Sequence, residues 1–143
     1  MPQSFVTRSE QETVDLAHRV GAGLKPGSTV LLRGDLGAGK TAFVRGLAEG
    51  LGLDPDVVTS PTFVIMQEYR GRTTLFHVDL YRLEGAAAID DLGIQDLTID
   101  GVVAIEWAER LPRPIEGAIN VTIEDAGGDV RRITMETSSY SVR

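Results

Sequence analysis

The sequence has no cysteine and no long apolar run, and these two absences exclude several kinds of site and segment. Without cysteine there is neither a disulfide framework nor a thiolate metal site. No apolar stretch approaches the roughly 20 residues that a membrane-spanning helix needs. Residues 1–8 also lack the apolar stretch and the cleavage signal of a secretory leader. We therefore expect a cytoplasmic protein that does not associate with a membrane.

Basic residues are also scarce. The chain carries 14 lysine and arginine residues against 21 aspartate and glutamate residues, for a formal net charge of −7. A chain with this balance repels a polyanion, which argues against autonomous binding to DNA or RNA. The balance is still compatible with a subunit that assists another nucleic-acid enzyme.

The remaining composition is that of an ordinary globular domain. The 143 residues are 42% apolar and 24% charged, so we expect one domain over residues 1–143. Hydrophobic periodicity predicts helices over 9–24, 40–51 and 84–92, and strands over 29–33, 63–69, 73–80, 102–105, 119–124 and 130–136. The first helix has capping-box spacing, because Glu12 stands three residues after Ser9. Gly46 and Gly50 weaken the second helix by about 1 kcal/mol each, a cost that close packing would explain.

A glycine-rich loop separates the strand over 29–33 from the helix over 40–51. It matches the phosphate-loop motif G-x-x-x-x-G-K-[ST] in full, as Gly34-Asp35-Leu36-Gly37-Ala38-Gly39-Lys40-Thr41. Glycines let backbone N–H groups turn into one anion-binding concavity, and the helix dipole adds positive charge there. A plain glycine-rich turn would explain the glycines but not the lysine and threonine that follow them.

This loop predicts a site for the phosphates of a nucleotide together with Mg²⁺. We expect Lys40 to reach the β- and γ-phosphates and Thr41 to ligate the metal ion. The expected nucleotide-binding residues are Asp35, Leu36, Gly37, Ala38, Gly39, Lys40, Thr41 and Ala42. The fold expected around such a loop is an α/β, three-layer fold like that of P-loop NTPases. Its central sheet should be mixed, parallel near the loop with antiparallel hairpins added.

A phosphate loop needs an acid at the end of a neighbouring strand. Glu106 ends the apolar run 102–105, which is the usual setting of a metal-orienting acid. Asp79 is a second candidate, because strand alternation places it on one face with His77 and Tyr81. A solvated face is an equally good interpretation for His77 and Tyr81, and a weaker one for Asp79.

Two further residues have competing interpretations. Thr62 lies in the segment 59–62, after the phosphate-loop helix, where nucleotide switches often occur. An ordinary Ser/Pro turn explains the same segment. Trp107 is the only tryptophan, and it should point away from Glu106 unless the strand has already ended. It is either a core residue or a reporter close to the nucleotide.

Taken together, these segments resemble the TsaE (YjeE) family. The resemblance rests on the phosphate loop and on three further segments over 60–63, 77–82 and 106–107, with matching order, spacing and total length. It covers roughly residues 9–110. The resemblance implies an ATPase subunit in the formation of threonylcarbamoyladenosine at tRNA position 37. It also implies partners, TsaD and TsaB, so that tRNA is met only indirectly.

The resemblance also implies roles for single residues. Lys40 is the phosphate lysine and Thr41 the metal ligand, while Glu106 and Asp79 surround the metal and the attacking water. Thr62 is the switch threonine. Arg82 and Arg110 are candidates for an arginine finger, although a partner could supply one instead.

Two other function classes fit the loop. A small-molecule kinase would need a mobile, arginine-bearing lid, and Arg70 and Arg72 lie on a short hairpin turn instead. A binding module without turnover would share the loop but not the hydrolysis. The absence of an N-K-x-D guanine motif favours adenine.

Overall fold

The computed structural model describes residues 2–34, 39–58, 65–81, 83 and 85–137. The strands are β1 (Gln3–Thr7), β2 (Thr29–Gly34), β3 (Met66–Tyr69), β4 (Thr74–Asp79), β5 (Gly101–Glu106), β6 (Ile119–Asp125) and β7 (Arg131–Thr137). The α-helices are α1 (Glu10–Ala22), α2 (Lys40–Gly50), α3 (Ala86–Asp90) and α4 (Ile94–Leu97), with short 3-10 helices η1 (Pro55–Val57) and η2 (Ala108–Arg110). No helix in the described ranges is both long and apolar enough to cross a bilayer.

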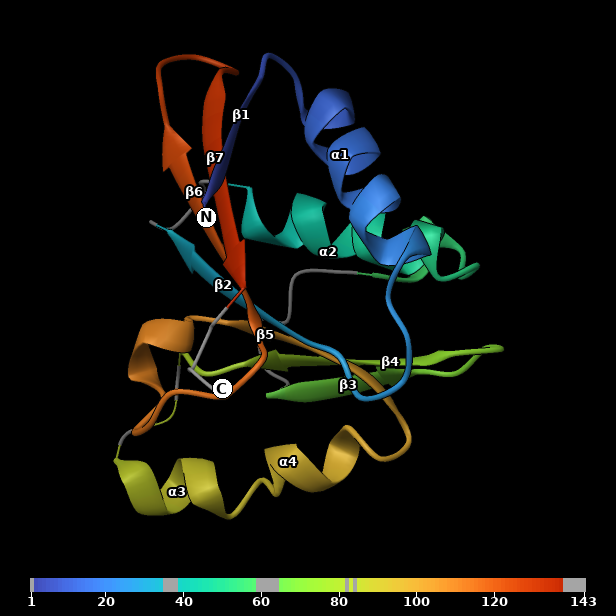
Figure 1. The fold of residues 1–143 in the computed structure, drawn as a ribbon, viewed down its shortest axis with the longest axis vertical. Helices are drawn as coiled ribbons and strands as arrows, with labels where there is room; N and C mark the ends of the chain where they lie inside the picture. The colour runs from blue at the N-terminus through green and yellow to red at the C-terminus, as the bar shows by residue number, and fades with distance from the viewer. Residues whose placement is uncertain (1, 35–38, 59–64, 82, 84, 138–143) are drawn as a thin grey trace.

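The strands form one sheet with the order β1-β7-β6-β2-β5-β4-β3. The four central strands β6, β2, β5 and β4 are mutually parallel, whereas β3, β7 and β1 pair antiparallel with their neighbours. Figure 1 shows α1 and α2 on one side of the central strands and α3 and α4 on the other. The predicted three-layer α/β fold with a mixed sheet is therefore confirmed.

The core is divided by the sheet, because successive side chains of a strand point to opposite faces. The cluster on the α1 and α2 side includes Leu32, Phe43, Val44, Leu47, Ala104 and Val121. The cluster on the opposite side includes Leu31, Phe76, Val78, Ile89, Ile94 and Ile105. Both faces of the central strands are therefore covered, which agrees with their nearly continuous apolar sequences.

Local sequence signals place several element ends correctly. The Ser9 hydroxyl accepts a hydrogen bond from the Glu12 backbone N–H at 3.1 Å, so Ser9 caps α1 as its spacing predicts. The Glu12 carboxylate accepts from the backbone N–H of Arg8 at 2.7 Å, one residue before the cap. The hairpin β6–β7 has one buried face, formed by Val121, Ile123 and Ile133.

Two elements differ from what the sequence predicts. The helix expected over 84–92 is present as the shorter α3, which ends at Asp90, and the second helix α4, which begins at Ile94, was not expected. Gly93 lies between the two helices with a left-handed backbone (φ 65°), which keeps them separate. The strand β1 was not expected at all, and it forms by pairing with β7 far along the chain, for example Phe5 with Ile133.

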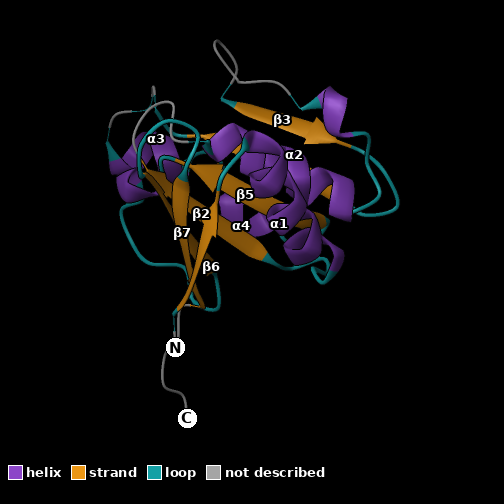
Figure 2. Cartoon of the chain, turned by 90° about the horizontal axis from the view of Figure 1, so that it is seen from above, coloured by secondary structure: helices purple, strands orange, loops and turns teal. Residues whose placement is uncertain are grey.

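Glycines let α1 and α2 approach very closely, and Figure 2 shows the two helices against one another over the strands. A Cβ atom on Gly46 would lie 2.3 Å from the Val14 carbonyl oxygen and 2.5 Å from the Ala17 Cβ. A Cβ atom on Gly50 would lie 2.3 Å from the His18 carbonyl oxygen. These neighbours are mainly backbone, so they cannot swing aside. The close approach explains two glycines that are otherwise unfavourable inside a helix.

We expect Gly46→Ala to destabilise the protein although alanine is the better helix former. The added methyl group forces α1 away from α2, and overpacking of this kind costs about 1–3 kcal/mol. Urea unfolding of purified protein measures the loss. Gly23→Ala is the matched control, because Gly23 has φ −95° and a Cβ atom placed there would meet no neighbour closer than 3.7 Å. Equal stability of Gly46→Ala and wild type would contradict the packing argument.

Candidate active site

The site lies where three parallel strands end beside the start of α2. Gly34 ends β2, Asp79 ends β4 and Glu106 ends β5. Figure 1 shows β2 ending on the same side of the molecule as α2 begins. Glu106 is in register with Leu32 on one neighbouring strand and with Asp79 on the other. Because paired residues of parallel strands share a face, both carboxylates lie on the α2 side of the sheet. Ligands of open α/β sheets bind at this edge.

Gly39 and Lys40 connect the described part of the phosphate loop to α2. Gly39 is the N-cap with φ 108°, and the first turn of α2 has no acidic side chain. The backbone N–H groups of this turn therefore remain suited to an anion. Lys40 is only 4% exposed, and its Nζ donates to the Gly34 carbonyl oxygen at 2.6 Å. Four predicted loop residues, Asp35, Leu36, Gly37 and Ala38, lie outside the described residues, while Ala42 is buried within α2.

Glu106 joins α2 to the sheet. Its Oε2 atom accepts a hydrogen bond from the Thr41 hydroxyl at 3.2 Å. The same oxygen lies 2.6 Å from His77 Nε2, and Glu106 is only 4% exposed. A buried carboxylate is costly unless it is paired and hydrogen-bonded. The two residues that the sequence predicts as metal ligands, Thr41 and Glu106, are thus in direct contact.

The donor set at this point suits Mg²⁺. Magnesium prefers oxygen ligands and is usually held by one or two protein groups together with phosphates and waters. Thr41 and Glu106 supply a hydroxyl and a carboxylate oxygen. Over the described ranges, no three His, Cys, Asp or Glu side chains form a group that could hold a metal by themselves. This arrangement fits a metal ion that is bound jointly with a phosphate ligand.

Asp79 lies beside this cluster with a raised pKa. Burial is the main cause, and the neighbouring Glu106 carboxylate raises the pKa further. The backbone N–H of Tyr81, which donates to Asp79 Oδ1 at 2.9 Å, opposes the shift. His77 and Lys40 oppose it as well. The net effect is a carboxyl group whose charged form is disfavoured in the folded protein.

Trp107 turns out of the strand and meets the lysine. The strand ends at Glu106, and Trp107 is the one described non-glycine residue with a positive φ, at 60°. Lys40 Nζ lies 3.7 Å from the centroid of the indole ring. A cation over an aromatic face is attracted by about 0.5–2 kcal/mol. The strand has thus ended before Trp107, which was the condition under which the sequence allowed this side chain to lie near Glu106. The indole lies at the site and also packs on the second core cluster.

The aromatic contact continues toward the surface. The ring centroids of Tyr81 and Trp107 are 4.8 Å apart, and the Arg110 guanidinium lies 5.7 Å from the Tyr81 ring. Arg110 also donates to the Leu83 carbonyl oxygen at 3.3 Å. Arg110, a candidate arginine finger, is thus held against Tyr81. Arg82, the other candidate, lies outside the described residues.

The fold brings most of the predicted polar residues together. Lys40, Thr41, Asp79 and Glu106 all lie at one end of the sheet, whereas Thr62 and its segment lie outside the described residues.

The interpretation of His77 as part of a solvated face was wrong, because the side chain is fully buried. Strand alternation placed His77 beside Asp79, but it could not show that helices cover that face. Tyr81, by contrast, is 47% exposed.

The raised pKa of Asp79 makes a prediction about stability. A carboxyl group whose folded-state pKa lies above its ordinary value of 3.8 destabilises the fold wherever it is ionised. That penalty is complete above the raised pKa and vanishes below the ordinary value. Asp79→Asn keeps an acceptor for the Tyr81 N–H and removes the penalty. We expect the variant to be more stable than wild type at about pH 7, with the gain shrinking toward about pH 4.

Urea unfolding in EDTA, without nucleotide, measures this difference across the pH range. Asp91→Asn is the control, because Asp91 is an exposed surface residue and should leave the profile unchanged. A lower stability of Asp79→Asn than of wild type at about pH 7 would show that the ionised carboxylate stabilises the fold, contrary to the raised pKa.

Comparison with known proteins gives the family. The family model described as "Threonylcarbamoyl adenosine biosynthesis protein TsaE" matches residues 7–133. A protein of Treponema pallidum (strain Nichols) named "tRNA threonylcarbamoyladenosine biosynthesis protein TsaE" is 42% identical over 132 residues, covering 91% of this chain and 97% of the relative. A Bacillus subtilis (strain 168) protein of the same name is 42% identical over 134 residues, covering 90% of this chain and 81% of the relative.

A solved structure shares the fold as well. The crystal structure of Bacillus subtilis YdiB superimposes with a TM-score of 0.75 at 36% sequence identity. The match covers 97% of this chain and 87% of the other. The family match spans both strands that carry the acids and the helix that follows the phosphate loop. This chain therefore belongs to the TsaE family.

Proposed function

We propose that this protein binds ATP with Mg²⁺ and hydrolyses it as a subunit in the formation of threonylcarbamoyladenosine at tRNA position 37. The observation that carries the proposal is the hydrogen bond between Thr41 and Glu106, beside the buried Lys40. It joins the helix that follows the phosphate loop to the acid at the end of β5. The pathway is supported by family membership and by the names of the relatives.

Phosphate binding uses the start of α2 and Lys40. The first N–H groups of α2 have no partner within the helix and carry its positive dipole end. Lys40 Nζ lies close to the Gly34 carbonyl oxygen and the Trp107 ring. A polyphosphate bound at this helix start would draw the ammonium toward its oxygens, because a charged acceptor makes the stronger hydrogen bond.

Hydrolysis requires a water molecule aligned with the terminal phosphate. Bound Mg²⁺ would supply positive charge that offsets the negative charge of the phosphates. Thr41 and Glu106 would hold the ion, and Asp79, whose strand neighbours that of Glu106, would orient the water. The raised pKa of Asp79 gives it a greater tendency to accept a proton than an exposed aspartate has.

The position of the β3–β4 turn argues against a small-molecule kinase. Arg70 and Arg72 lie at this turn, before Thr74, while the site lies at the Asp79 end of β4. Five steps along a strand separate the two ends by about 16 Å. Arg70 is also paired with Glu68, with 2.6 Å between Nε and Oε2. These arginines are therefore poorly placed to close over a bound phosphate.

Partner proteins would supply the contact with tRNA. The net charge of −7 opposes direct binding of a polyanion. We propose TsaD and TsaB as these partners, with each hydrolysis event resetting their complex between turnovers. The exposed Tyr81 and Arg110, stacked beyond Trp107, lie next to the site and are available to such a complex.

We expect Glu106→Gln to separate nucleotide binding from hydrolysis. The amide keeps the size of the side chain but loses the charge that holds metal and water, so kcat should fall by about 10²-fold or more. The dissociation constant for ATP, measured by calorimetry, should change little. Lys40→Ala should weaken ATP binding itself, because Lys40 contacts the phosphates. Turnover is followed with TsaD, TsaB, tRNA and ATP, by mass spectrometry of the modified nucleoside.

Each negative result has a distinct meaning. Multiple-turnover modification by Lys40→Ala would refute a role for ATP hydrolysis by this chain. Equal losses of binding and turnover in Glu106→Gln would make Glu106 a structural or primary binding residue. Wild-type protein that binds ATP but never hydrolyses it, even with its partners, would be a binding module.

A further inference from the structure

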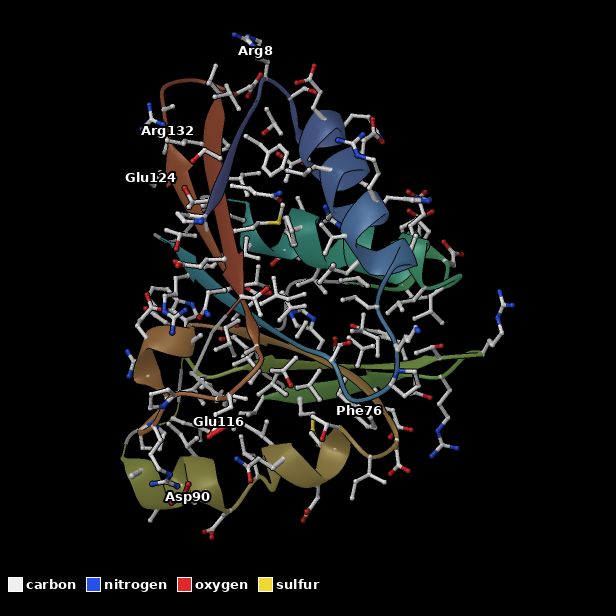
Figure 3. The ribbon with its side chains drawn as sticks, in the orientation of Figure 1. Arg8, Phe76, Asp90, Glu116, Glu124 and Arg132 are labelled. Atoms are coloured by element: carbon white, nitrogen blue, oxygen red, sulfur yellow. The ribbon has the colours of Figure 1, made fainter. Side chains whose placement is uncertain are left out.

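His77 is a fully buried polar residue that takes no part in the proposed contacts with phosphate, metal or water. The chain contains two histidines, and His77 is the one inside the protein, on β4. Its Nε2 atom lies 2.6 Å from Glu106 Oε2. Its strand neighbour Phe76 points to the opposite face, toward α4, as Figure 3 shows. His77 therefore faces α2 and the site.

The direction of the hydrogen bond follows from the partner. An ionised carboxylate can only accept, so His77 Nε2 carries the hydrogen and donates it to Glu106. The Thr41 hydroxyl donates to the same oxygen, Oε2, at 3.2 Å. Neither bond uses Oε1. Two donors on one oxygen, one from the sheet and one from the helix, restrict the rotation of the carboxylate.

Core packing does not explain a histidine at this position. His77 Nδ1 is buried without a hydrogen-bond partner among the described residues. A buried polar atom without a partner costs about 1–3 kcal/mol. The position is in register with Ala104 and lies on the face of the first core cluster, next to Leu75 along its own strand. An aliphatic side chain would fill this space without that cost.

We propose that His77 is a positioning residue, whose Nε2–H holds the Glu106 carboxylate in the orientation needed for hydrolysis. The proposal rests on the hydrolytic function proposed above. Without this donor the carboxylate gains rotational freedom at the point where metal and water must be aligned. Loss of such an outer-shell partner typically costs 10–100-fold in activity or metal affinity. Phosphate binding, which uses Lys40 and α2, should not depend on it.

The test compares variants with and without a hydrogen-bond donor at this position. His77→Leu removes it, whereas His77→Gln restores an N–H at nearly the same distance from the backbone. His18→Leu is the matched control, because His18 Nδ1 contacts Glu49 Oε1 at 2.8 Å on the surface, with side chains 46% and 38% exposed. The measurements are kcat, the KM for ATP, the Mg²⁺ concentration at half-maximal rate, the Kd for ATP and the thermal midpoint, with the partner complex present for the kinetics.

We expect His77→Leu to lower kcat or raise the Mg²⁺ requirement by about 10–100-fold, while the Kd for ATP stays at the wild-type value. His77→Gln should recover most of the loss, and His18→Leu should match wild type. If His77 had only a structural role, the variants would change the thermal midpoint, and kcat would not depend on whether the side chain carries an N–H donor. If His77→Leu does not fold, His77→Asn replaces it, because its shorter amide cannot reach Glu106.

Two results would overturn the proposal. One is wild-type kcat and Mg²⁺ dependence in a folded variant without the donor. The other is a loss of kcat that His77→Gln leaves entirely unrepaired although that variant is folded. Failure of the proposed ATP hydrolysis can be told apart from failure of the role of His77. In the first case the wild-type protein itself shows no ATP turnover.

Discussion

The structure depends on one buried carboxylate, that of Glu106. A charge in this position is tolerated only with hydrogen-bond partners, and the fold provides them from two directions, Thr41 at the start of α2 and His77 on β4. These partners are 65 and 29 residues away from Glu106 along the chain. Only the strand order β2-β5-β4 brings them together. The hydrogen bonds from Thr41 and His77 that stabilise the buried Glu106 carboxylate thus also bring together the residues of the site.

The helix layer supports the same arrangement from outside. Gly46 and Gly50 let α2 lie against α1 at backbone distance, and Gly21 of α1 approaches the Leu47 backbone in the same way. Helices packed through backbone contacts cannot shift without opening the interface. α1 and α2 therefore pack as one layer on the face of the sheet that carries the first core cluster.

Family membership gives the site its biological setting, and the described geometry adds two features to it. The first is the column formed by Lys40, Trp107, Tyr81 and Arg110, which leads from the buried lysine to the surface. The second is the left-handed backbone of Trp107, a conformation that costs about 1–3 kcal/mol in a bulky residue and often marks a functional site. Both lie where the strands β4 and β5 end, so Lys40 is connected to the exposed Arg110 through the rings of Trp107 and Tyr81.

The sequence alone determined what depends on local patterns. The strand–loop–helix context of the phosphate motif, the Ser9 cap and the mixed α/β fold follow from periodicity, spacing and turn chemistry within short segments, and the fold is confirmed. From the sequence, Glu106 and Asp79 were alternative candidates for the acid beside Lys40 and Thr41, and only the resemblance implied that both belong to the site. Tertiary structure decided what depends on distant partners. β1 forms by pairing with β7, and His77 is fully buried on the face of the sheet that carries the first core cluster. Alternation shows which side chains share a face, but only packing between distant segments determines whether that face meets water.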